Sequence, residues 1–200
     1  MSATAFSFPR TTVPQPTVPQ PTVPQPTLPQ PTASQPTAPV RKSVVGIAEI
    51  KIISGLDGEL LTYALGSCLG LVVFDPDAHV AGLLHAMLPS SAVSPEKATA
   101  TPAMFVDTGV PELFKACYRA GAVKQRLQVY AAGCAHLAAP GESDMFQIGR
   151  RNMVTLRKLL WKNGVLLTRH DTEGAESRTM SLSMATGKVH ILIRGQQRPL

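Results

Sequence analysis

Apolar and polar residues alternate in several short stretches after residue 43, and a period of two is typical of β-strands. The first stretch covers residues 44–53 and ends at a turn-forming cluster, Ser54 to Gly58. Further strands are expected at residues 60–65, 69–74, 80–88, 127–132, 165–168, 179–184 and 189–193. The pattern therefore predicts a fold that is rich in strands.

Helical spacing of apolar residues occurs in two places. The first helix is expected after Asp107 and before Gly121, with one face formed by Val110, Leu113, Phe114, Cys117 and Tyr118. The second is expected before Gly164, with one face formed by Ile148, Asn152, Leu156, Leu159 and Leu160. Together with the strands, they predict an α+β domain in which helices pack on β-sheets.

The segment before this domain has a different composition. It contains 11 of the 18 prolines, most of them in the repeats VPQPT, VPQPT, VPQPT and LPQPT. Proline removes backbone donors and fixes φ, so we expect polyproline II or disorder. The chain is accordingly divided into a disordered Pro-rich tail, residues 1–43, and a domain, residues 44–200. The tail is interpreted as a spacer, with a PxxP ligand for a partner groove as the alternative.

The charge balance argues against a nucleic-acid partner. The whole chain has a formal charge of +6, but residues 44–200 carry 16 Lys or Arg against 13 Asp or Glu. Such a small excess without a basic run is typical of an ordinary solvated surface. No apolar stretch approaches the length of about 20 residues that spans a membrane. We therefore expect no membrane insertion and a cytoplasmic protein.

The cysteines and histidines show no metal-binding spacing, and the sequence lacks the common nucleotide-binding and zinc-protease motifs. Cys134 and His136 are two residues apart, but two ligands do not make a metal site. Neither a metal nor another cofactor is expected. The three cysteines, Cys68, Cys117 and Cys134, cannot all pair, so at least one thiol is free for another role.

Cys68 follows Gly66 and Ser67 in a bend of small residues at the end of an expected strand. Such a bend can expose a side chain and point successive backbone N–H groups at one place. The backbone N–H groups of Ser67 and Cys68 are therefore candidates for an oxyanion hole. Ser67 is a rival nucleophile, although it lacks the G-x-S-x-G context of serine hydrolases.

His85 lies in an otherwise apolar strand, where an imidazole needs a polar partner. If residues 69–74 and 80–88 form a hairpin, Cys68 and His85 come to the same end of the sheet. The imidazole could then take the thiol proton and stabilise the thiolate, while the Thr62 hydroxyl orients the ring. The alternative is structural: a lone Cys is often a small buried apolar residue, and a lone His a core residue with its hydrogen bonds satisfied.

These residues resemble those of the CheD family, the chemoreceptor glutamine deamidases of bacterial and archaeal chemotaxis. The resemblance rests on LGSC ending at Cys68, on Thr62 six residues earlier, and on H-x-M-L-P starting at His85. The stretches VVGIAEIKI and I-G-x-x-N at residues 148–152 support it, as do Asp171, Gly174 and Arg178 more loosely. The similarity covers residues 44–193 and leaves out the Pro-rich tail.

The resemblance implies that Cys68 is the nucleophile, His85 the general base and Thr62 the residue that orients it. The implied reaction is hydrolysis of a receptor glutamine side chain to glutamate and ammonia through a thioester on Cys68, without a cofactor. The implied partners are methyl-accepting chemoreceptors and a CheC-type phosphatase. The sequence departs from the family pattern around Gly133-Cys134, at Glu173-Gly174 and at Ser177, which concerns receptor docking and loop shape.

Two other functions remain open at this stage. A non-catalytic regulatory protein of the chemotaxis system could bind the same partners, but it would not need Thr62, Cys68 and His85 together. An unrelated cysteine protease is disfavoured, because the sequence indicates no cleft for an extended chain.

Overall fold

The structure, a computed structural model, describes residues 40–136 and 144–200. Its strands form two five-stranded sheets. The first sheet contains, in spatial order, β1 (Lys42–Val44), β3 (Glu59–Leu65), β8 (Arg178–Ser183), β9 (Val189–Ile193) and β10 (Gln196–Pro199). The second contains β2 (Glu49–Ser54), β5 (Val80–Ala86), β4 (Leu69–Asp75), β6 (Gln128–Gly133) and β7 (Arg169–Thr172).

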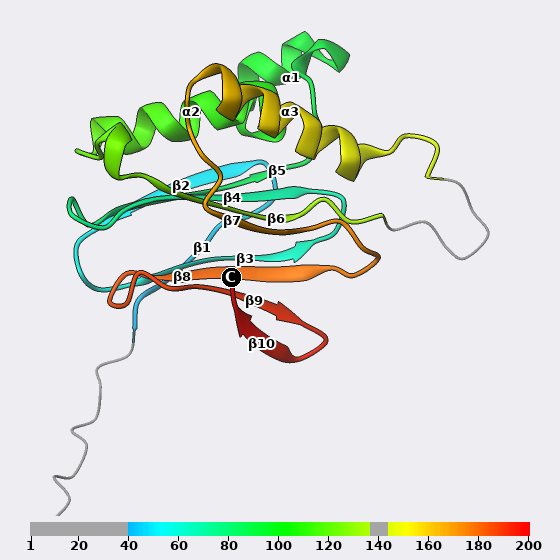
Figure 1. The fold of residues 1–200 in the computed structure, drawn as a ribbon. Helices are drawn as coiled ribbons and strands as arrows, with labels where there is room; N and C mark the ends of the chain where they lie inside the picture. Colours follow the sequence, from blue (N-terminus) through cyan, green and yellow to red (C-terminus); the bar gives the residue numbers. More distant parts are fainter. Residues whose placement is uncertain (1–39, 137–143) are drawn as a thin grey trace, which may run out of the picture. The chain divides into compact units, whose positions relative to one another are not determined.

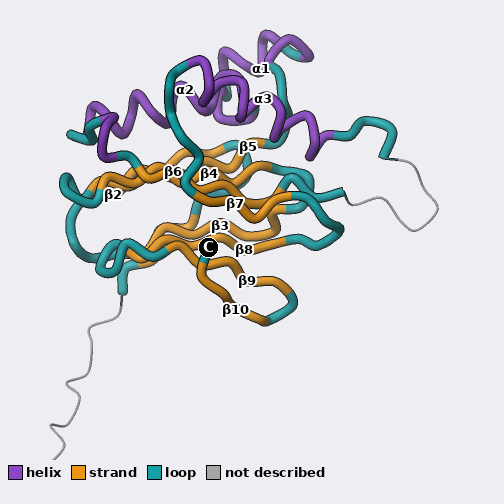
Figure 2. The backbone as a smooth tube through the Cα atoms, viewed as in Figure 1, coloured by secondary structure: helices purple, strands orange, loops and turns teal. Residues whose placement is uncertain are grey.

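The two sheets lie one above the other, and the helices cover the outer face of the second sheet (Figure 1). The longer helices are α2 (Val106–Arg119) and α3 (Ile148–Lys162), and α1 (Pro95–Ala100) is short. Three 3-10 turns are η1 (Ser91–Val93), η2 (Pro102–Met104) and η3 (Lys124–Arg126). Figure 2 shows this order of layers, helices on sheet on sheet. The predicted α+β class is confirmed.

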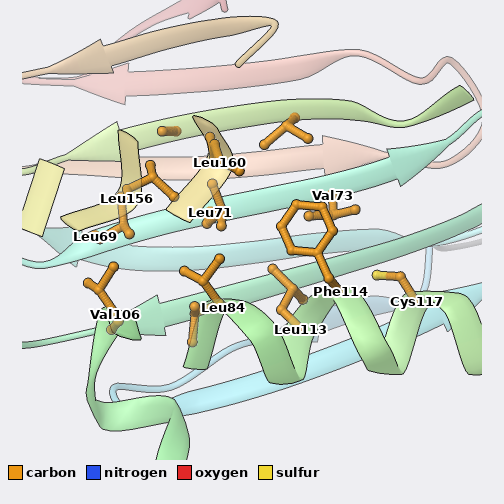
Figure 3. Packing of buried hydrophobic residues seen from close by; sticks show 14 of the residues in the cluster. Leu69, Leu71, Val73, Leu84, Val106, Leu113, Phe114, Cys117, Leu156 and Leu160 are labelled. Atoms are coloured by element: carbon orange, nitrogen blue, oxygen red, sulfur yellow. The ribbon is translucent and has the colours of Figure 1, made fainter. Parts of the chain in front are cut away.

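Two apolar layers hold the fold together. One lies between the helices and the second sheet, where Leu113 and Phe114 of α2 and Leu156 of α3 pack toward Leu71 and Leu84 (Figure 3). The other lies between the sheets. Its larger members are Leu60, Leu65, Val72, Phe74, Leu83, Met180, Leu182 and Ile191. The second sheet is thus covered on both faces, which explains why β4 and β5 are apolar along nearly their whole length.

The expected single strand at residues 44–53 is wrong, because the chain turns in its middle. β1 pairs with β3 in the first sheet, whereas β2 pairs with β5 in the second. The turn passes through Ala48, which has a φ of +58°. The alternation of apolar residues runs through the turn in the sequence, although Val44 and Ile47 are exposed and Val45 between them is buried.

Other differences occur where strands are polar or lie at sheet edges. The strand expected at residues 165–168 is wrong, since β7 begins at Arg169 and is formed by Arg-His-Asp-Thr. β10 was not predicted, because all four of its residues are exposed and show no alternation. The strand expected at 80–88 ends at Ala86. The predicted helices are confirmed, whereas the predicted tail lies almost entirely outside the described residues.

Candidate active site

The hairpin of β4 and β5 brings Cys68 and His85 to one end of the second sheet. The two strands pair antiparallel, with Leu69 opposite Ala86 and Gly70 opposite His85. Cys68 comes directly before Leu69, so it lies at the end of β4 that pairs with the end of β5 containing His85. This juxtaposition confirms the expectation from the sequence.

Thr62 contacts His85 from the other sheet. Its Oγ1 lies 2.8 Å from Nδ1 of His85 and donates a hydrogen bond of 2.8 Å to the Val45 carbonyl oxygen. A hydroxyl has one hydrogen, so Oγ1 must accept from Nδ1–H of the neutral ring. The proton is therefore on Nδ1, and the lone pair of the imidazole is on Nε2.

Nε2 of His85 is buried and has no hydrogen-bond partner within the described part of the chain. Burial lowers the pKa of His85 from its ordinary value of 6.5, which keeps the ring neutral near pH 7. The site therefore holds an imidazole whose basic nitrogen is free to accept a proton.

The surroundings of the Cys68 thiol do not by themselves favour the thiolate. Burial raises the pKa of Cys68 from its ordinary value of 9.0, and a hydrogen bond from its own backbone N–H offsets this only in part. The resting pair is accordingly a thiol and a neutral imidazole. A Cys68 thiolate stabilised by His85 stays a prediction, because burial of the sulfur disfavours the charged form and the local hydrogen bond offsets this only in part.

The bend that carries Cys68 is held by its carbonyl groups. The N–H of Ala135 donates to Gly66 O and that of Cys134 to Cys68 O, both at 2.8 Å. The Asn152 side chain donates to Ser67 O at 3.0 Å. With all three carbonyls bound, the N–H groups of Ser67 and Cys68 donate to no carbonyl oxygen in the described residues.

Two further residues shape this bend, and neither was a predicted catalytic residue. Gly133 has a φ of +94°, and a Cβ atom there would lie 2.2 Å from the Cys68 carbonyl oxygen. Asn152 lies in α3 and is fully buried, as its position on the apolar helix face predicts. The signals in the sequence were a glycine after an apolar strand, an amide on an apolar helix face and the I-G-x-x-N stretch that contains this amide.

The late motif lies beside the same region. Arg178, which is almost fully buried, donates to an Asp171 carboxylate oxygen at 2.9 Å and also to the carbonyls of Glu173 and Gly133. This guanidinium ties the segment after β7 to the end of β6. The departures at Glu173 and Ser177 thus fall in a loop whose backbone an internal arginine holds.

The other two cysteines differ from Cys68 in exposure, although Cys134 contacts the bend of Cys68 through its backbone N–H. Cys117 and Cys134 are buried, and burial raises the pKa of each to about 12. His136 contacts Asp144 at 3.1 Å. Within residues 40–136 and 144–200, no three His, Cys, Asp or Glu side chains gather closely enough to hold a metal ion. No helix in those ranges is both long and apolar enough to span a membrane.

The two stacked sheets and the Cys68, His85 and Thr62 cluster define a candidate cysteine-dependent enzyme. Comparison with known proteins gives its family. A sequence profile described as CheD chemotactic sensory transduction matches residues 87–192. A protein of Syntrophus aciditrophicus, named a probable chemoreceptor glutamine deamidase CheD 1, is 43% identical over 152 residues, 76% of this chain and 94% of its own length.

Similar relatives occur in distant organisms. A protein of Solibacter usitatus is 41% identical over 157 residues, 78% of this chain and 92% of that protein. A protein of Pyrococcus abyssi is 39% identical over 158 residues, 78% of this chain and 95% of that protein. Both are named probable chemoreceptor glutamine deamidase CheD. The chain belongs to the CheD family, as the motifs around Cys68 and His85 indicated.

Proposed function

We propose that this protein is a chemoreceptor glutamine deamidase that uses Cys68 as nucleophile and His85 as general base. The names of its relatives support the reaction and the substrate class. The observation that carries the assignment of residues is the bond between Thr62 and Nδ1 of His85, which leaves Nε2 as the basic nitrogen at the strand end beside Cys68.

The reaction begins when Nε2 of His85 takes the proton from the Cys68 thiol. The sulfur attacks the carbon of the glutamine side-chain amide and forms a tetrahedral intermediate with a negative oxygen. The backbone N–H groups of Ser67 and Cys68 donate to that oxygen. The raised pKa of Cys68 makes the base essential, because little thiolate exists before the substrate binds.

The same imidazole completes the cycle. The imidazolium returns its proton to the amide nitrogen, the C–N bond breaks, and ammonia departs. A thioester remains on Cys68. His85 then takes a proton from water, whose oxygen attacks the thioester carbon. The C–S bond breaks, the imidazolium returns its proton to the Cys68 sulfur, and the glutamic acid leaves and loses its proton to solvent. Thiol, imidazole and backbone donors provide attack, proton transfer and oxyanion stabilisation.

The decisive experiment is intact-mass analysis of purified receptor cytoplasmic segments after incubation with the protein. Deamidation replaces an –NH2 group by –OH at each site and releases ammonia, so both products can be measured. The native protein is expected to modify the receptor, and Cys68→Ala to leave it unmodified. Cys117→Ala is the control, since Cys117 is a buried residue of α2.

Two results separate the alternatives. If Cys68→Ala modified the receptor as fast as the native protein does, the assignment of the nucleophile would be overturned. A native protein that binds the receptor or a CheC-type phosphatase but releases no ammonia would support the non-catalytic binding protein instead.

A further inference from the structure

Asn152 connects the turn of the nucleophile to the strand of the base. It lies in α3, is fully buried, and its Nδ2 donates hydrogen bonds to the carbonyl oxygens of Ser67 at 3.0 Å and Met87 at 3.1 Å. Ser67 is the residue before Cys68, and Met87 is the second residue after His85. A single side chain thus binds both halves of the candidate catalytic pair.

The backbone does not make this connection by itself. The ladder between β4 and β5 ends at the pair of Leu69 and Ala86, next to Cys68. Beyond it, the N–H of Met87 donates to the Met104 carbonyl at 2.9 Å, away from the turn of Cys68. The two strands therefore separate where proton transfer requires a fixed distance between Cys68 and His85. Asn152 bridges the segments at this point.

The hydrogen bonds also determine how the amide is oriented. Both neighbours are carbonyl oxygens, which only accept, so Nδ2 must face them and both of its hydrogens are used. Oδ1 is then buried, without a partner in the described residues. A buried acceptor without a partner is unfavourable, so this side chain is not the one that stability alone favours.

The helix that carries Asn152 is held close to the site. A Cβ atom at Gly149 would lie 2.5 Å from the Cys134 carbonyl oxygen, so only glycine allows the first turn of α3 to approach this closely. Cys134 itself donates to the carbonyl of Cys68. Asn152 therefore acts from a rigid element whose position relative to the bend is fixed independently.

We propose that Asn152 is a positioning residue that sets the Cys68 sulfur relative to Nε2 of His85. This inference rests on the proposed function, because it assigns Asn152 a part in proton transfer between these two groups. A misplacement of about 1 Å can cost roughly 100-fold in rate.

The first test compares Asn152→Leu with Asn163→Leu. Asn163 follows α3 at its other end and donates to the Leu159 carbonyl at 2.8 Å, so it controls for loss of an amide donor on the same helix. Asn152→Leu is expected to lower kcat roughly 10- to 100-fold with KM changed by less than about 3-fold. Asn163→Leu is expected to keep the native kcat.

A double-mutant cycle with His85→Ala distinguishes positioning from general damage. If Asn152 acts by placing the imidazole and the sulfur together, Asn152→Leu should change the residual rate of His85→Ala by less than about 3-fold. An equal loss in both backgrounds would overturn the proposal, as would a native kcat in folded Asn152→Leu.

Asn152→Asp covers the case in which the leucine variant does not fold, because it keeps the shape of the side chain. A carboxylate cannot donate to the Ser67 and Met87 carbonyls, whereas the protonated form donates to one of them. The rate of Asn152→Asp relative to native should therefore rise as the pH falls. A ratio that is constant with pH would contradict the proposal.

Alkylation of Cys68 separates this inference from the proposed function. If the native protein does not deamidate receptors, the function is wrong, but the rate at which iodoacetamide labels Cys68 still reports the imidazole beside it. Asn152→Leu should then move the pH profile of labelling to that of His85→Ala. An unchanged profile would overturn the role of Asn152 whatever the substrate is.

Discussion

Thr62 and His85 belong to different sheets, yet their side chains share a hydrogen bond of 2.8 Å. Because the Thr62 hydroxyl gives its only hydrogen to the Val45 carbonyl, this bond selects one tautomer of the imidazole. In the proposed mechanism, the threonine therefore acts through the imidazole.

Replacing Thr62 by valine should lower kcat about 10-fold, which corresponds to the loss of one hydrogen bond of about 1–1.5 kcal/mol. Thr62→Ser keeps the hydroxyl and should keep most of the activity. His85→Ala should cost roughly 100-fold or more, because it removes the proton acceptor. Steady-state rates of the three variants test this order, and a valine variant slower than His85→Ala at equal stability would contradict the roles.

The pH dependence of kcat/KM should show a plateau with two limits. Activity needs a neutral His85, so it should rise with pH through a pKa below 6.5, where burial places this group. It should fall above 9.0, because an ionised Cys68 no longer supplies the proton that the leaving ammonia takes from the imidazolium. A pH profile of receptor deamidation checks both limits, and an activity maximum confined to pH values below 6.5 would contradict the assignment.

Alkylation near pH 8 should label Cys68 before the other two cysteines. Cys68 is partly accessible, whereas Cys117 and Cys134 are fully buried and their pKa values are raised to about 12. Because the Cys68 thiol also has a raised pKa, its labelling should depend on His85 and slow in His85→Ala. Peptide mass mapping identifies the labelled residue, and equal labelling of all three would be inconsistent with this site.

Gly133→Ala should damage both stability and catalysis, and Gly121→Ala provides a matched control. Both glycines have positive φ, +94° and +104°, but a Cβ atom meets the Cys68 carbonyl oxygen only at Gly133. Gly121→Ala should lose about 1 kcal/mol from backbone strain, and Gly133→Ala a further 1–3 kcal/mol, about the cost of overpacking. Urea unfolding and kcat of both variants test this, and equal losses would show that the contact with Cys68 has no effect.

The hairpin that joins Cys68 to His85 could be predicted, because β4 and β5 are apolar runs that end at an Asp-Pro-Asp turn. The break between β1 and β2 could not, since apolar residues continue through the turn at Ala48 even where they are exposed, as Val44 and Ile47 are. The pKa of Cys68 could not be predicted either, because desolvation depends on how chains far apart in the sequence pack around the sulfur.

The role of Asn152 illustrates the same limit at the level of one residue. Its position on an apolar helix face could be derived from the sequence, and its place in an I-G-x-x-N stretch was visible. The two carbonyls that it binds lie 85 and 65 residues earlier in the chain, and no local pattern connects them. Polar β7 and exposed β10 were missed for a simpler reason, since edge strands need no apolar alternation.

The division of the site between the two sheets determines when activity can first appear during folding. The second sheet with its helices carries Cys68, His85 and Asn152, but Thr62 and Val45 are held by the first sheet. A folding intermediate with only the second sheet in place would therefore contain a nucleophile beside an imidazole whose proton is not confined to Nδ1. We therefore expect full enzymatic activity to require the docking of the two sheets, and to recover during refolding after secondary structure appears.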